Sequence, residues 1–285
     1  MTPEEYCQQK TSQSGSSFYY SFVVLPKKQR QAITALYAFC REVDDVVDNI
    51  AEPSIAQTKL EWWRSELDRL YQGQPQHPVT QALAHVLADT DLPKEQLEEI
   101  IDGMAMDLEQ NRYTSFKELS LYCYRAASVV GLLAAQIFGY RNHHTQKYAR
   151  DLGMAFQLTN IIRDVREDAQ RNRIYLPQKM LTEFHIYESD ILALKQTPEL
   201  SQLLAELAAQ ARYYYQRALK HLPKEDRYAQ RAGLMMSAIY QTILDEVEQD
   251  GFRVMQHRIS LPPMRKLWIA MKVLFNEKLR RLLRR

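Results

Sequence analysis

Apolar side chains recur every three or four residues along most of this chain, which is the spacing of amphipathic α-helices. The pattern predicts helices at residues 27–50, 54–71, 78–88, 93–110, 115–131, 143–167, 198–222 and 228–257, with a polar loop at 168–177. No convincing stretch alternates apolar and polar residues as a strand does, and no linker divides the chain. We therefore expect an all-α protein with a single domain over residues 1–285.

The composition supports long helices and excludes several classes of protein. The chain has 8 glycines, where average usage would give about 20, and it contains neither G-x-G-x-x-G nor a Walker A string, which argues against Rossmann and P-loop folds. Three scattered cysteines fit a reducing compartment rather than a disulfide framework or a zinc site. The N-terminus lacks a signal region, and no run of about 18 apolar residues occurs. We expect a cytoplasmic protein without a membrane-spanning segment.

Two acidic clusters are the strongest chemical signal. Asp44 and Asp48 are four residues apart, and so are Asp164 and Asp168. On a helix this spacing stacks two carboxylates on one face, where they repel each other unless a cation lies between them. Apolar residues surround both clusters, so the acidic faces should look inward. Ligands that offer only oxygen suit Mg²⁺, which commonly bridges carboxylates to the phosphates of a substrate.

A solvated acidic helix face is the alternative interpretation of either cluster alone. Two observations together favour the functional one: there are two clusters in apolar surroundings, and an arginine precedes each. Arg41 lies three residues before Asp44, and Arg163 lies directly before Asp164. The sequence therefore predicts a diphosphate site with Mg²⁺ held between two helices.

The C-terminal segment, residues 264–285, is unusually basic. It contains eight Lys and Arg and one Glu, whereas the formal net charge of the whole chain is only +2. Its apolar residues, Trp268 among them, have helical spacing. A basic amphipathic helix of this kind is typical of membrane-surface binding, and the alternative is a helix docked on the body of the protein. Nucleic-acid binding is disfavoured because the rest of the chain has no basic stripe.

Five stretches resemble the motifs of a known enzyme family. They are 17–26 (SFYYSFVVLP), 37–48 (YAFCREVDDVVD), 122–131 (YCYRAASVVG), 157–177, which begins QLTNIIRDVRED, and 240–258. On these motifs the chain resembles the squalene/phytoene synthases, which join two prenyl diphosphates head to head. The match extends over nearly the whole chain.

The resemblance implies a single large helical bundle around a deep central cavity, the isoprenoid synthase fold, with a prenyl diphosphate as substrate. It implies Mg²⁺ as cofactor, for which Mn²⁺ could substitute. The implied metal ligands, which are also catalytic, are Asp44, Asp48, Asp164 and Asp168. The implied diphosphate contacts are Arg41, Gln157, Asn160, Arg173, Tyr240 and Arg258. The implied neighbours of the prenyl chains are Phe18, Phe22 and Tyr37, and Tyr122 is the implied catalytic residue near the reacting carbons.

The product is predicted from a finer resemblance. Residues 14–20 and 102–107 look most like the bacterial hopanoid-pathway members, although Ser14 and Gly15 stand where some relatives have His-Ser. We expect two farnesyl diphosphates to give presqualene diphosphate without NADPH, with a downstream pathway enzyme as partner. The alternatives are a phytoene synthase using two geranylgeranyl diphosphates, a dehydrosqualene or squalene synthase, and a non-catalytic assembly factor. The presence of all four aspartates disfavours the last.

Overall fold

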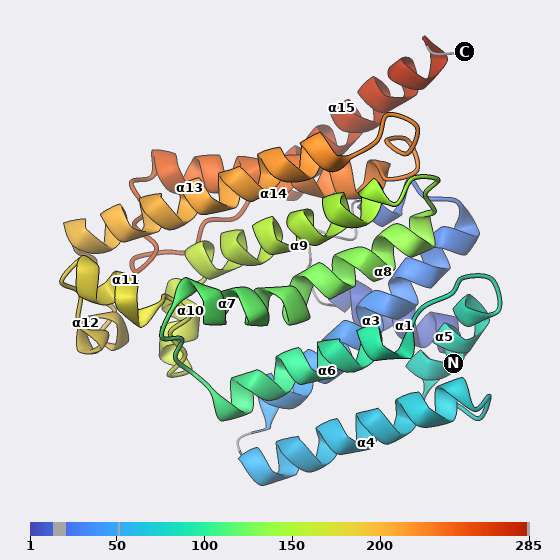
Figure 1. The fold of residues 1–285 in the computed structure, drawn as a ribbon, viewed down its shortest axis with the longest axis horizontal. Coiled ribbons are helices and arrows are strands. Elements are labelled where there is room, and N and C mark those ends of the chain that lie inside the picture. The colour runs from blue at the N-terminus through green and yellow to red at the C-terminus, as the bar shows by residue number, and fades with distance from the viewer. Residues whose placement is uncertain (14–20, 51, 284–285) are drawn as a thin grey trace.

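The computed structural model describes residues 1–13, 21–50 and 52–283, which form helices joined by short connections (Figure 1). The first half contains α1 (Pro3–Gln13), α3 (Lys27–Asn49), α4 (Pro53–Tyr71), α5 (Pro78–Leu87), α6 (Lys94–Glu109) and α7 (Phe116–Cys123). The second half contains the π-helical turn η1 (Tyr124–Ser128), α8 (Val129–Phe138), α9 (His144–Arg163), α10 (Val165–Gln170), α11 (Gln178–Glu183), α12 (Glu188–Leu192), α13 (Pro198–His221), α14 (Arg231–Gln249) and α15 (Pro263–Leu282). Apart from one isolated bridge, these ranges contain no β-structure, so the all-α prediction is confirmed.

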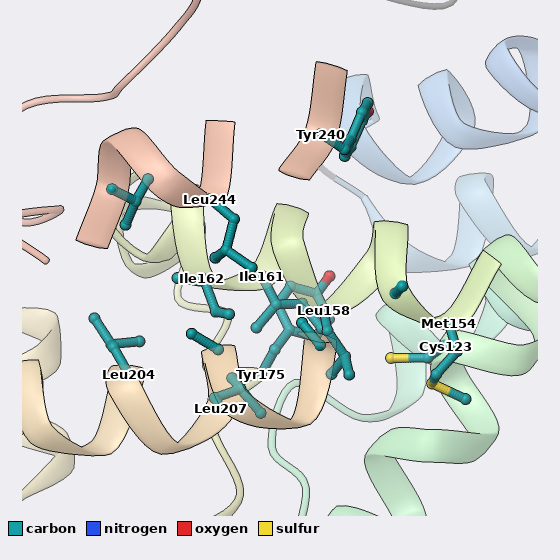
Figure 2. Packing of buried hydrophobic residues seen from close by; sticks show 14 of the residues in the cluster. Cys123, Met154, Leu158, Ile161, Ile162, Tyr175, Leu204, Leu207, Tyr240 and Leu244 are labelled. Carbon is teal, nitrogen blue, oxygen red and sulfur yellow. The ribbon is translucent and has the colours of Figure 1, made fainter. Parts of the chain in front are cut away.

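The long helices form a bundle whose core has two main parts. In Figure 1, α13 and α14 lie at the top, α9 and α8 lie below them, and α6 and α4 lie at the bottom, with α3 behind. One apolar cluster is built around α9, α13 and α14, and the other around α3 to α6 and α8. Figure 2 shows Ile161 of α9 between Leu207 of α13 and Leu244 of α14. The first acidic cluster lies near the end of α3 and the second begins directly after α9, and both line one cavity between these helices.

Local sequence features explain several helix boundaries. Thr197 caps α13, because its hydroxyl accepts a hydrogen bond from the N–H of Leu200 at 3.2 Å. Pro198 follows in the first turn, where a missing N–H costs nothing. Ser115 caps α7 in the same manner, through the N–H of Glu118 at 3.4 Å. These capped and proline-led starts agree with the boundaries expected from the sequence.

Contrary to the prediction, the second acidic cluster does not lie on one continuous helix. The helix expected at 143–167 ends at Arg163, and Asp164 has φ −105° and ψ 15°, so Asp168 belongs to the separate helix α10 rather than to a loop. The N–H of Asp168 nevertheless donates to the carbonyl of Asp164 at 2.9 Å, which keeps the two residues one turn apart. The helix expected at 228–257 is also shorter, because α14 ends at Gln249 before a turn in which Phe252 has φ +56°.

Two glycines let α9 pack directly on the segment formed by η1 and α8. A Cβ at Gly153 would lie 2.5 Å from the carbonyl oxygen of Ala127, and a Cβ at Gly131 would lie 2.6 Å from that of Ala149. No side chain can occupy those spaces without moving backbone, so these residues must be small. The continuous helix from Phe116 to Phe138 is long and apolar enough to cross a membrane by composition alone. It packs against α6 and α9 within the bundle, as the core helix of a globular protein does.

Candidate active site

A polar chamber of about 700 Å³ lies between α3, α6, α9, α10 and α14. It brings together residues from motifs that are far apart in the sequence. The predicted site residues that line it are Tyr37, Arg41, Asp44, Asp48, Tyr122, Gln157, Asn160, Asp164, Asp168, Arg173, Tyr240 and Arg258. A hollow of about 790 Å³ between α1, α3 and α5 is of similar size, but none of these residues lines it. We therefore take the polar chamber as the site.

The segment that follows the second acidic cluster reaches back to the first. Arg173 donates to Asp48 at 2.7 Å and to the carbonyl of Val47 at 3.0 Å, and Arg171 donates to Asp48 at 2.9 Å. Arg173 is mostly buried, with 12% of its side chain exposed. These contacts fix the end of α3 against the turn after α10. Arg171 was not among the residues predicted from the sequence.

Arg41 and Arg258, which were expected to bind the diphosphate, and Arg163, which precedes the second cluster, pair with nearby aspartates. Arg41 forms ion pairs with Asp44 and, at 2.6 Å, with Asp45. Arg163 and Arg258 each donate to Asp164, both at 2.7 Å. Cations and carboxylates are therefore already arranged face to face. The same guanidinium groups have the donor geometry that binds diphosphate oxygens in charge-assisted hydrogen bonds.

The carboxylates differ in how well positive charge compensates them. Burial, followed by repulsion from Asp48, raises the pKa of Asp44 to about 6. Burial and the nearby charges of Asp164 and Asp107 raise the pKa of Asp168 to about 8. Burial acts in the same direction on Asp164, but Arg163 and Arg258 outweigh it and hold its pKa below the usual value. Nearby arginines therefore compensate Asp164 fully, whereas at Asp44, despite its ion pair with Arg41, and at Asp168 they only partly offset burial and repulsion.

This charge pattern fits a divalent cation. The facing side chains of both clusters are carboxylates, the hard oxygen ligands that Mg²⁺ prefers. Within the described ranges, no three acidic, His or Cys side chains lie close enough to hold an ion by themselves. Mg²⁺ is commonly held by one or two carboxylates, with water and substrate phosphates as its remaining ligands. Asp44, Asp48, Asp164 and Asp168 would supply the protein's share.

The same chamber contains a tyrosine–aspartate cluster that was not predicted from the sequence. Asp107 of α6 accepts hydrogen bonds from Tyr175 at 2.8 Å and from Tyr122 at 3.2 Å, and the two rings stack 4.9 Å apart. Burial raises the pKa of Asp107 to about 7, although Arg173 and the two hydroxyls oppose the shift. Asp107 lies in the segment 102–107 and Tyr175 in the segment 157–177, both of which resemble family segments. No pattern in the sequence indicated that these two residues would be in contact. Tyr122 therefore belongs to a hydrogen-bonded group with Asp107 and Tyr175.

An apolar pocket of about 200 Å³ continues from the polar chamber into the bundle. Residues that line both spaces include Tyr37, Gln157 and Asn160. Phe22 is buried at the pocket and makes an edge-to-face contact with Tyr37, with ring centroids 6.2 Å apart. Phe18 lies outside the described residues. A charged chamber that opens into an apolar pocket matches a ligand with an anionic head and a hydrocarbon tail.

Comparison with known proteins decides the family. The family model described as squalene/phytoene synthase matches residues 11–265. The chain belongs to this family. It is 36% identical over 281 residues to a 15-cis-phytoene synthase of Synechococcus elongatus, covering 92% of this chain and 89% of the relative. It is 33% identical over 291 residues to a 15-cis-phytoene synthase of Synechocystis, covering 95% and 86% of the two chains.

Solved structures agree with this assignment. A dehydrosqualene synthase superposes with a TM-score of 0.84 at 29% identity, covering 97% of this chain and 96% of the other. Squalene synthase HpnC from Alicyclobacillus acidocaldarius gives a TM-score of 0.79 at 26% identity, covering 88% and 94%. The predicted family and isoprenoid synthase fold are confirmed. The protein is a prenyltransferase-type enzyme of the group that condenses prenyl diphosphates head to head.

Proposed function

We propose that this enzyme is a Mg²⁺-dependent phytoene synthase that joins two geranylgeranyl diphosphates head to head. The observation that carries the proposal is the continuity of the charged chamber with the apolar pocket through Tyr37, Gln157 and Asn160. The choice of a C20 substrate is supported by the relatives from Synechococcus elongatus and Synechocystis, which are phytoene synthases. This choice replaces our sequence-based preference for presqualene diphosphate.

The chamber residues have distinct roles in this reaction. Arg173 and Arg258 stabilise the negative charge that grows on a departing diphosphate. Bound Mg²⁺ would add Lewis-acid stabilisation of the same charge, with the four cluster aspartates holding it. The apolar pocket keeps water away from the allylic cation, and the ring faces of Tyr37 and Phe22 can stabilise positive charge. The carboxylate of Asp107, through its hydrogen bond with the hydroxyl of Tyr122, is placed to take up the proton lost from carbon.

A second candidate uses the shorter farnesyl diphosphate. Two molecules would give presqualene diphosphate, as the sequence analysis expected, and no NADPH would be needed. The similarity to a dehydrosqualene synthase and to squalene synthase HpnC, at 29% and 26% identity, favours it. The mechanism at the charged chamber is the same for both substrates, so the two candidates differ only in chain length and in how far the product is processed.

Separate incubations distinguish the candidates. Purified enzyme with Mg²⁺ receives either geranylgeranyl or farnesyl diphosphate, and the extracted lipids are identified by mass spectrometry. Our proposal requires a C40 hydrocarbon from the C20 substrate, and more rapid turnover of that substrate. Presqualene diphosphate from farnesyl diphosphate alone would replace it with the second candidate. A reaction that starts only when NADPH is added would contradict both.

We also propose that α15 attaches the enzyme to an anionic membrane surface. One side of α15 packs on the body through Ala270 and Leu274, whereas Trp268, Phe275 and Leu282 on another side are 63%, 66% and 67% exposed. The helix also carries six described basic residues, which are Arg265, Lys266, Lys272, Lys278, Arg280 and Arg281. Lys272 lies 5.2 Å from the ring centroid of Trp268, whereas Arg265 pairs with Glu246 on the body of the protein. This pattern is typical of helices that lie in the plane of a membrane.

The position of α15 supports a role in product release. Lys266, in its first turn, lines the polar chamber, so the exposed face begins beside the cavity. In Figure 1 the opposite end of α15 extends beyond the bundle. A long hydrocarbon product would pass more readily from the cavity into lipid than into water. We propose a cytoplasmic enzyme held at the inner face of the membrane, which delivers its product to a downstream pathway enzyme.

A further inference from the structure

The apolar pocket has a closed end far from the charged chamber. The segment formed by η1 and α8 runs antiparallel to α9 along it, because Gly153 meets Ala127 and Gly131 meets Ala149. From Asn160, at the rim that both spaces share, α9 runs twelve residues back to Tyr148, or about 18 Å at 1.5 Å per residue. Tyr148 therefore lies at the far end of the pocket.

Contacts from α14 close this end. Gln230 donates to the carbonyl of Ala135 at 3.2 Å and to that of Gly139 at 3.0 Å, which ties the start of α14 to the end of α8. One turn later, Gly233 faces Tyr148 so closely that an added Cβ would lie 2.7 Å from the tyrosine hydroxyl oxygen. The ring of Tyr148 thus extends from α9 to α14 across the end of the pocket.

The hydroxyl of Tyr148 is unusual for a buried group. Only 1% of the residue is exposed, and the described part of the chain offers its oxygen no hydrogen-bond partner. A buried hydroxyl without a partner destabilises a protein, so phenylalanine would be the better residue for packing alone. Its effect on geometry is clear: the oxygen lengthens the side chain and fills the space beside Gly233.

We propose that Tyr148 sets the depth of the apolar pocket and so limits the length of the prenyl chain that the enzyme accepts. This inference rests on the proposed function in one respect, namely that the pocket holds a prenyl tail. The last isoprene unit of the longest accepted substrate meets the Tyr148 ring. A chain with one further isoprene unit is excluded because the ring and α14 leave no room for five more carbons.

The test compares Tyr148→Leu with wild type on the C15, C20 and C25 prenyl diphosphates. The ratio of kcat/KM for C25 to that for C20 should rise at least ~10-fold, a change of the size that one or a few methylene groups produce in an apolar pocket. Tyr148→Met is a second variant that retains more volume. Tyr215→Leu is the matched control, because Tyr215 is equally buried, on α13, but does not line the pocket. An unchanged ratio in both Tyr148 variants would overturn the inference.

Binding provides a readout that does not depend on turnover. Unreactive thiodiphosphate analogues of the three chain lengths are added to each variant, and the shift in melting temperature is measured. The C25 analogue should raise the melting temperature of Tyr148→Leu more than that of wild type. It should raise the melting temperature of Tyr215→Leu no more than that of wild type. Binding of the analogues without any coupled product would contradict the proposed function and leave this inference standing. Equal length preference in all variants would contradict only the inference.

A double-mutant cycle checks the contact itself. Gly233→Ala should lower the melting temperature, because the new Cβ meets the hydroxyl oxygen of Tyr148 at 2.7 Å. Adding Tyr148→Phe should restore it, since the nearest ring carbon is 3.6 Å from that Cβ, an ordinary contact distance. Tyr148→Phe alone should be at least as stable as wild type. Additive effects would show that Tyr148 does not reach Gly233, which would remove the basis of the inference.

Discussion

Replacing Asp168 with asparagine tests whether nearby positive charge compensates this carboxylate incompletely. Burial, then Asp164 and Asp107, raises the pKa of Asp168 to about 8, whereas an unfolded chain has an Asp pKa of about 3.9. Between these two values the folded state keeps the proton and the unfolded state loses it. The free energy of unfolding should therefore fall as pH rises from about 4 to about 8 in metal-free buffer.

The size of the effect follows from the shift. A difference of about 4 pKa units corresponds to at most about 6 kcal/mol. Water that enters the open chamber screens part of this cost, so we expect Asp168→Asn to be more stable than wild type by about 2 kcal/mol at pH 8.5, with little difference at pH 4.5. The variant should also lose activity, because an amide is a poorer Mg²⁺ ligand than a carboxylate.

Urea unfolding in the presence of EDTA, followed by circular dichroism at pH 4.5, 6, 7.5 and 8.5, measures this directly. Asp89→Asn serves as control, because Asp89 is exposed and pairs with Lys28 outside the chamber. The control should keep the pH dependence of wild type, and Asp168→Asn should flatten it. If Asp168→Asn and wild type lose stability in parallel as pH rises, the charge imbalance at this site is not as described.

Three further predictions concern the metal and the membrane. Asp44→Asn and Asp164→Asn should each lower turnover by at least ~10²-fold. Asp45→Asn, whose carboxylate does not line the chamber, should lower turnover much less. Near-normal turnover of the Asp44→Asn/Asp164→Asn double variant would refute the metal assignment. Mg²⁺ should raise the melting temperature more at pH 8 than at pH 6, because it must displace protons from Asp44 and Asp168; a larger effect at pH 6 would contradict this. Each basic residue near an anionic surface contributes about 1 kcal/mol to membrane attachment, so co-sedimentation with anionic liposomes should fall as salt is added. It should also fall in Trp268→Ser and in Phe275→Ser. Equal sedimentation of wild type and the Trp268→Ser/Phe275→Ser double variant would mean that α15 is only a helix docked on the body of the protein.

The sequence predicted those parts of the site that depend on local spacing. The i, i+4 aspartates and their preceding arginines are features of single helices, so Asp44, Asp48 and Arg41 could be placed on one face without knowledge of the fold. The break at Asp164 could not be foreseen, because neither glycine nor proline marks it. There the apolar periodicity continues past the break, so the sequence pattern carries no signal of it.

Long-range contacts were beyond the reach of the sequence. Asp107 and Tyr175 are 68 positions apart, yet their hydrogen bond completes the group around Tyr122. The meeting of Tyr148 with Gly233 likewise depends on how α9 packs on α14. Both contacts follow from the arrangement of helices in the bundle, and the motifs themselves carry no signal of them. The choice between a C15 and a C20 substrate likewise depends on the end of the pocket, which is a tertiary feature, so the motifs alone do not determine it.

Product analysis of the enzyme with and without its metal tests the central claim most directly. The claim is that the two aspartate clusters and the apolar pocket together couple prenyl diphosphates head to head. Wild type with Mg²⁺ and geranylgeranyl diphosphate should yield a C40 hydrocarbon by mass spectrometry, and neither EDTA-treated wild type nor folded Asp44→Asn/Asp164→Asn should yield it. Product formation at the full wild-type rate in EDTA or in the double variant would contradict the account. So would the absence of any coupled product when wild type with Mg²⁺ receives the C15 or the C20 substrate.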